Sequence, residues 1–168
     1  MSSETKDKDF LKFWENISLH TKDETLIILK GHLLLEDLMR EYCASKMEDE
    51  KALKEAKLSY IQTMYLTKSL QKELPRDWLW TGLQKVNSLR NLLAHNLSPD
   101  DYERKRNEFI EFVKSNMDDA KIFNAFKSNY EQLAVAIFVI YSTLSSHLRF
   151  NAKSFLAALA GPKPDAKD

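Results

Sequence analysis

The sequence predicts an all-α protein, an up-and-down bundle of five to six helices. Only three glycines and four prolines interrupt 168 residues, so long helices meet few breakers. Apolar residues make up 43% of the chain and recur at helical spacing, whereas no segment alternates as a strand does. The length fits one domain with one core, which we place at residues 1–150. Residues 151–168 are expected to form a short extension with a disordered tail, GPKPDAKD.

Three helices are expected in the first half of the chain, at residues 7–18, 23–46 and 48 to about 70. The first, DKDFLKFWENIS, is short and amphipathic. The second is long, and its leucines and isoleucines repeat every three or four positions over a broad face. Leu74-Pro75 ends the third, because the residue before a proline is biased away from helical backbone angles.

Three more helices are expected in the second half. Asp77 can cap a helix over residues 77–96. Ser98-Pro99 then restarts the chain, with the serine as N-cap and the proline in the first helical position, for a helix over 99–115. The last helix should span 118–148, and its nearly continuous apolar middle predicts that it lies at the centre of the bundle.

Charge and cysteine content restrict the function. The formal net charge is zero, whereas a protein that coats nucleic acid is usually basic, so any such contact would need a local patch. Residues 66–96 carry five bases against two acids, which could equally be a solvated face. A single cysteine excludes an intrachain disulfide, and the N-terminal MSSETKDKD lacks the apolar core of a signal peptide. The apolar run 133–144 is too short to span a bilayer, so we expect a cytoplasmic protein without membrane contact.

One stretch, RNLLAHN at residues 90–96, combines residue types that suit phosphate chemistry. Histidine is the side chain suited to proton transfer near neutral pH, which is the role His95 could play, and Arg90 can hold two phosphate oxygens at once. Asn91 lies one turn before His95 on the same helix face. Arg90 and His95 are about 140° apart around a helix, so they would converge more naturally from two copies of the chain across a two-fold axis. No paired cysteines or His-x-x-x-His spacing offers a metal site, and we expect no cofactor.

The order Arg90-Asn91, three residues, His95 resembles the motif of the HEPN superfamily (higher eukaryotes and prokaryotes nucleotide-binding). The upstream LKGHLLLEDLMREY at 29–42 is similar to the long second helix of such proteins, which often carries an acid facing the motif. The resemblance implies an all-α fold with the motif at the end of a late helix. It also implies a metal-independent endoribonuclease, with two motifs lining one cleft of a homodimer. Arg90, His95 and Asn91 would then be the catalytic residues.

Many proteins of this superfamily act in toxin–antitoxin, abortive-infection and phage-defence systems, so the resemblance implies RNA and an antitoxin or defence partner protein as partners. Toxins of the family that are neutralised by nucleotidyltransferase antitoxins carry a tyrosine two residues after the histidine. Leu97 stands at that position here, so the resemblance does not predict that modification.

Further residues are candidates for supporting roles. Glu36, one turn after His32, could orient Arg90, or could simply form an exposed pair with the histidine. The positive charges nearest the motif could hold RNA phosphates, or could belong to an ordinary solvated helix face; they are Lys85, Arg104, Lys105 and Arg106.

Two other functions stay open. One is a non-catalytic HEPN-fold regulatory or binding protein for a nucleotide, RNA or a partner protein. The other is a helical adaptor without a ligand. The Arg90-Asn91-His95 set favours the ribonuclease, whereas the zero net charge and the absence of a basic tail do not.

Overall fold

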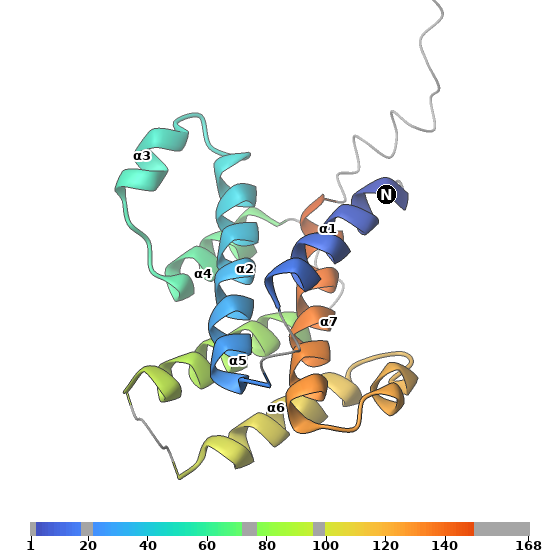
Figure 1. Ribbon diagram of the computed structural model, residues 1–168. Coiled ribbons are helices and arrows are strands. Elements are labelled where there is room, and N and C mark those ends of the chain that lie inside the picture. The colour runs from blue at the N-terminus through green and yellow to red at the C-terminus, as the bar shows by residue number, and fades with distance from the viewer. Residues whose placement is uncertain (1–2, 18–21, 72–76, 96–99, 150–168) are drawn as a thin grey trace, which may run out of the picture.

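The computed structural model describes residues 3–17, 22–71, 77–95 and 100–149, and every regular element in those ranges is a helix (Figure 1). The predicted all-α class is therefore confirmed. The helices are α1 (Ser3–Asn16), α2 (Glu24–Ala44), α3 (Glu50–Glu55), α4 (Tyr60–Leu70), α5 (Trp78–His95), α6 (Tyr102–Ser115), the 3₁₀ helix η2 (Lys121–Ala125) and α7 (Asn129–Arg149).

Helices α2 and α7 pack along each other and form the middle of the molecule (Figure 1). Helix α1 covers one side of this pair, and α4 packs against α2 on another. Helices α5 and α6 pack on each other and run across the lower ends of α2 and α7 in this view, rather than alongside them. The structure thus differs from a simple up-and-down bundle in its second half.

One hydrophobic core joins all the longer helices. Helix α7 contributes the most continuous part of it, with Leu133 through Ile137 and Ile140, Tyr141 and Leu144 all buried. The predicted central position of the last helix is confirmed, since it contacts α1, α2, α5 and α6. Helix α3 is different, because none of its six residues is buried.

The third predicted helix, 48–70, is wrong as a single element because it is two helices. The backbone leaves helical geometry at Lys57, which has a left-handed φ of 47°. Ser59 then caps α4 in a capping box: its hydroxyl accepts from the backbone N–H of Gln62, while the Gln62 side chain accepts from the backbone N–H of Ser59. The Ser-x-x-Gln signal was present in the sequence, but continuous apolar spacing on both sides concealed it.

The last predicted helix begins eleven residues too early, at 118 instead of Asn129. The intervening segment turns as the 3₁₀ helix η2, which buries Phe123 against the core. Ser128 then starts α7, where the Glu131 carboxylate accepts hydrogen bonds from the Ser128 backbone N–H at 3.1 Å and from its hydroxyl at 2.6 Å. Both bonds run from Ser128 to Glu131, and they satisfy a backbone N–H that the helix start leaves free.

Other expected boundaries agree closely with the structure. Helix α5 begins directly after Asp77, and α6 begins at Tyr102, three residues later than predicted. The Ser98-Pro99 start signal and the extension 151–168 lie outside the described residues.

Two glycines set how closely the helices approach α7. A methyl group built on Gly31 of α2 would lie 2.6 Å from Cγ2 of Ile137, and one built on Gly82 of α5 would overlap Cδ1 of Ile140. The two contacts differ in kind, because the Ile140 atom ends a flexible side chain, whereas Ile137 Cγ2 is attached directly to Cβ.

Gly31→Ala is therefore expected to destabilise the protein. Overpacking costs about 1–3 kcal/mol and exceeds the roughly 1 kcal/mol that alanine gains over glycine in a helix. Gly82→Ala is the matched variant and should lose less, since Ile140 can change rotamer. Urea unfolding of both variants measures the difference. A Gly31→Ala protein at least as stable as the wild type would contradict this packing argument.

Candidate functional site

The candidate site is a polar strip on α5 that faces α2. Asn87, Arg90 and Asn91 are half-buried and lie on one side of the helix, because they are three or four residues apart. Val86 and Leu89, which bury the helix in the core, point to a different side. The core contacts of α5 therefore fix the direction in which the strip points.

His32 of α2 meets this strip inside the protein. Its Nε2 lies 3.1 Å from Asn87 Oδ1, and its ring stacks on Tyr60 of α4 with centroids 4.1 Å apart and planes inclined by 24°. The Tyr60 hydroxyl in turn donates to the backbone carbonyl of Leu83 on α5, at 3.4 Å. Three helices thus share one buried polar junction, in which His32 is 5% exposed.

His32 is neutral at this junction. Burial lowers its pKa below the usual 6.5, and the hydrogen bond to Asn87 and the Glu36 carboxylate only partly oppose that shift. Arg90 lowers the pKa of His32 further, so its positive charge acts on the imidazole. Since Asn87 Oδ1 is an acceptor, Nε2 carries the proton of the neutral ring. The 3.8 Å approach of His32 Nδ1 to Glu36 is therefore not a salt bridge at neutral pH.

Glu36 does not support Arg90 in the way the sequence suggested. Its carboxylate accepts from Arg40, at 3.0 Å from Nε and 2.6 Å from Nη2. Arg40 also donates to the backbone carbonyl of Leu58, just before α4. Arg40, held by Glu36, therefore ties α2 to the start of α4, and among the described residues no ion pair joins Glu36 to Arg90.

The Arg90 guanidinium uses only part of its hydrogen-bonding capacity within the described chain. Its Nη1 donates to Asn91 Oδ1 at 3.1 Å, and no carboxylate of the described chain pairs with it. A guanidinium has five N–H donors, so several stay available to an anion. The half-buried Arg90 is a cation whose counter-charge the described residues do not supply.

His95 is the last residue of α5, and its side chain is exposed. Because α5 stays helical through His95, this residue and Arg90 keep the angular separation of about 140° expected for five helical residues. Asn91 lies between them around the axis. The structure thus brings Arg90 and Asn91 together, and places His95 in a different direction around α5 from Arg90.

The predicted RNA-binding cations have different surroundings. Arg106 is buried and pairs with Glu24 of α2, its Nη1 lying 2.9 and 3.1 Å from the two carboxylate oxygens. Arg104 is exposed but pairs with Asp101 and Glu108. Lys105 is half-buried on the same helix.

The fourth of these cations, Lys85, lies on α5. Its ammonium sits over the Phe112 ring, 5.2 Å from the centroid, and its side chain is half-buried. Lys85 therefore joins α5 to α6 through a cation–π contact.

Sequence reasoning missed two members of the junction, Asn87 and Tyr60. Asn87 precedes Asn91 by one helical turn, so the period of a polar strip on α5 was visible in the sequence. Nothing local marks Tyr60, because only the packing of α4 against α2 brings its ring onto His32.

Comparison with known proteins gives no match, whether to a family model, to a curated protein or to a solved structure. Within the described ranges, no three histidine, cysteine or acidic side chains gather closely enough to hold a metal ion. None of the helices in those ranges has the length and apolar character needed to cross a membrane. The described part of the chain is thus an all-α protein with a polar junction between α2, α4 and α5.

Arg106 is predicted to stabilise the fold. Arg106→Gln would leave Glu24 partly buried without its counter-charge, so the free energy of unfolding should fall by about 2–3 kcal/mol; Glu24 keeps a hydrogen bond from Tyr102, which limits the loss. Arg104→Gln is the matched control and should cost at most about 1 kcal/mol, as expected for an exposed pair. Denaturant titration of both variants measures this, and equal losses would be inconsistent with the buried pair.

His32 predicts a pH dependence of stability. Because its pKa is lowered in the folded state, the unfolded chain binds the proton first as pH falls below about 6.5. This contribution to stability is complete above that pH and is lost toward acid. His32→Gln, whose amide can still donate to Asn87, should lose stability less steeply than the wild type between about pH 7 and pH 5. Urea unfolding across this range checks the sign, and parallel curves would refute it.

Proposed function

We propose that the protein is a metal-independent endoribonuclease of HEPN type, with a composite Arg90/His95 site between two copies of the chain. The observation that carries the proposal is the half-buried Arg90 guanidinium, which has no carboxylate partner among the described residues. An arginine in that state is suited to a phosphate. The motif resemblance and the all-α fold agree with it.

The chemistry assigned to these residues is cleavage by the ribose itself. His95 of one copy takes the proton of a 2′-hydroxyl, and the 2′-oxygen attacks the adjacent phosphorus. Arg90 stabilises the added negative charge on the phosphorane, with Asn91 holding its guanidinium at 3.1 Å. The P–O5′ bond then breaks, the 5′-oxygen takes a proton, and the products are a 2′,3′-cyclic phosphate and a free 5′-hydroxyl.

Two copies of the chain are needed because His95 and Arg90 point about 140° apart on one helix. The end of α5 that carries His95 lies at the edge of the described structure (Figure 1), and His95 is exposed there. A two-fold axis near this end would bring the histidine of one copy toward the arginine of the other. A toxin or phage-defence role follows from the resemblance, as does an antitoxin or defence partner.

The alternative is a HEPN-fold protein that binds a nucleotide, RNA or a partner without cleavage. The engagement of Arg106 with Glu24, and of Arg104 with Asp101 and Glu108, favours it. Those contacts leave few free positive charges beside the motif for RNA.

We predict that the purified protein cleaves single-stranded RNA in the presence of a chelator. Arg90→Ala or His95→Ala should each lower the rate by about 10²–10⁴, the scale of losing charge stabilisation or proton transfer. Lys51→Ala, an exposed position on α3 that is purified identically, is the control for contaminating nucleases and should keep the activity. Products with 2′,3′-cyclic phosphate ends are expected. RNA that is bound and left intact would establish the alternative and overturn the proposal.

Mixing the two inactive variants tests the composite site. If Arg90 and His95 act across the two-fold axis, an equal mixture should recover about a quarter of the wild-type rate, because half of the dimers are mixed and each holds one intact site. A mixture as inactive as its components, with subunit exchange verified, would show that the two residues act within one chain.

A further inference from the structure

Helices α4 and α5 differ in charge from the other α-helices of the molecule. Each of the others carries at least one aspartate or glutamate, whereas α4 and α5 carry none. Their bases are Lys68, Lys85 and Arg90, in a chain whose formal net charge is zero. The two helices pack against each other, so their outward sides form a basic surface without a carboxylate of its own.

The two lysines of this surface are positioned by aromatic rings. The Lys68 ammonium lies over the Trp80 ring, 5.9 Å from its centroid, and the Lys85 ammonium lies over the Phe112 ring at 5.2 Å. Among the described residues, neither lysine has a carboxylate within ion-pair distance. A ring attracts a cation without neutralising its charge, and the ammonium keeps its N–H donors. Both positive charges are therefore available to a phosphate.

An exposed aromatic side chain, Tyr65 of α4, lies on the same surface and is 53% exposed. Its hydroxyl accepts a hydrogen bond of 3.2 Å from the Gln84 amide of α5, which restrains the ring. Lys68 stands three residues after Tyr65, so the two side chains are neighbours on α4. A ring of this kind can stack on a base while a nearby cation holds the backbone, as in proteins that bind single-stranded nucleic acid.

The outward side of α5 leads from Tyr65 to His95. Gln84, Ser88 and His95 lie within about 40° of one another around the helix axis, because they are four and seven residues apart. Ser88 and His95 are exposed. The eleven residues from Gln84 to His95 correspond to about 16 Å along the helix. Tyr65 therefore lies on the same side of the molecule as the proposed proton acceptor, within reach of one short strand.

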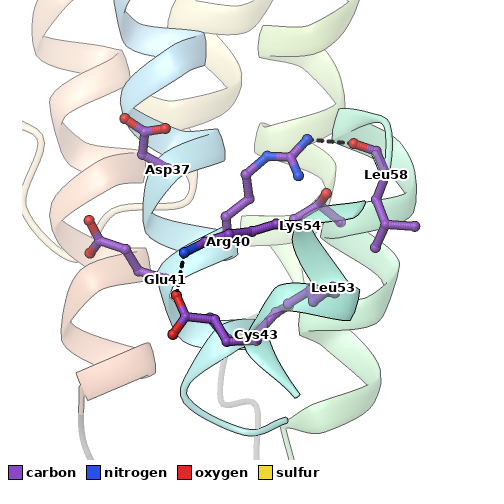
Figure 2. Close-up of a pocket in the computed structure, with 10 residues that line it drawn as sticks. Asp37, Arg40, Glu41, Cys43, Leu53, Lys54 and Leu58 are labelled. Atoms are coloured by element: carbon purple, nitrogen blue, oxygen red, sulfur yellow. Dashed lines mark hydrogen bonds and ion pairs between the residues drawn. The ribbon is translucent and has the colours of Figure 1, made fainter. Parts of the chain in front are cut away.

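The pocket between α2, α3 and α4 offers no comparable charge. It lies under α3, which stands away from the bundle as an arch (Figure 1) and buries none of its own residues. Arg40 donates there to the Leu58 carbonyl (Figure 2). The Lys54 ammonium lies 2.7 Å from a carboxylate oxygen of Glu50. The cations of this pocket are thus already engaged, unlike the lysines of α4 and α5.

We propose that single-stranded RNA lies along the surface formed by α4 and α5. A base stacks on Tyr65, and Lys68 and Lys85 bind phosphates next to it. The strand then follows the outward side of α5 to His95. This inference rests on the proposed ribonuclease function, which supplies RNA as the ligand and His95 as the point of cleavage. Stacking and phosphate contacts read no base edge, so we expect little sequence preference along this surface.

Two probes of equal charge separate stacking from phosphate binding: a short 2′-O-methyl oligouridylate and an abasic strand with the same number of phosphates. Both are end-labelled and titrated with the full-length protein by fluorescence anisotropy. The wild type should prefer the oligouridylate by about fivefold to a hundredfold, the scale of one stacked base. Tyr65→Leu should remove that preference, whereas Tyr65→Phe, which keeps the ring, should retain most of it. Equal affinity of the wild type and Tyr65→Leu for the oligouridylate would overturn the stacking assignment.

The salt dependence of binding counts the phosphate contacts. For single strands, each neutralised phosphate contributes about 0.7 to the slope of log K against log salt concentration. Lys68→Gln and Lys85→Gln should each lower the slope by about that amount for both probes. Lys51→Gln, an exposed position on α3, is the matched control and should leave the slope unchanged. Unchanged slopes in the Lys68 and Lys85 variants would refute the phosphate contacts.

The RNA surface and the ribonuclease function can fail separately in these experiments. The probes lack the attacking 2′-hydroxyl, so their binding does not depend on cleavage. Unmodified RNA that is bound with the expected effects of the variants and stays intact would refute the ribonuclease and support the surface. For RNA that is cleaved, Tyr65→Leu should raise KM and leave kcat nearly unchanged. Cleavage with the same KM in Tyr65→Leu and the wild type would support the ribonuclease and refute the surface.

Discussion

The close approach of α2 and α5 to α7 is the constraint on which the rest of the structure depends. Gly31 lets α2 settle against Ile137, and Gly82 lets α5 settle against Ile140, one turn further along the same helix. Both helices are thereby fixed on one support, which brings His32 of α2 to Asn87 of α5. The polar junction is thus a consequence of apolar packing. The distance between His32 and Asn87 depends on how closely α2 and α5 pack on α7.

The junction also shows how the fold accommodates polar groups in its interior. His32 is uncharged, hydrogen-bonded and stacked on Tyr60, so it avoids the large cost of a buried unpaired charge. The buried charge of Arg106 is treated in the opposite way, by direct pairing with Glu24. A hydrogen bond of 2.7 Å from the Tyr102 hydroxyl to the same carboxylate completes that cluster. Both solutions join α2 to a helix more than fifty residues away in the sequence.

The sequence was sufficient to predict those features of the fold that depend on local periodicity. The helical class, the central last helix and the start of α5 follow from apolar spacing and from Asp77 before that helix. It failed where a local signal lay inside a continuous apolar pattern, as with the capping box at Ser59. The partner of Glu36 had a local signal, since Arg40 stands one helical turn after it, whereas the expected partner Arg90 lies on another helix. Arg106 was expected to be a free surface cation. Its burial against Glu24 could not be predicted, because Glu24 lies in a helix far away in the sequence.

The arch formed by α3 has a consequence for how the molecule moves. Its helix buries no side chain, and its own ion pairs, Lys51 to Glu55 and Lys54 to Glu50, join neighbours within a single turn. Because its residues are not buried in the bundle, α3 forms a unit of low local stability. Amide hydrogens of this segment therefore exchange with solvent by local opening, long before those of α2 and α7, and substitutions can accumulate in it without cost to the folding of the whole.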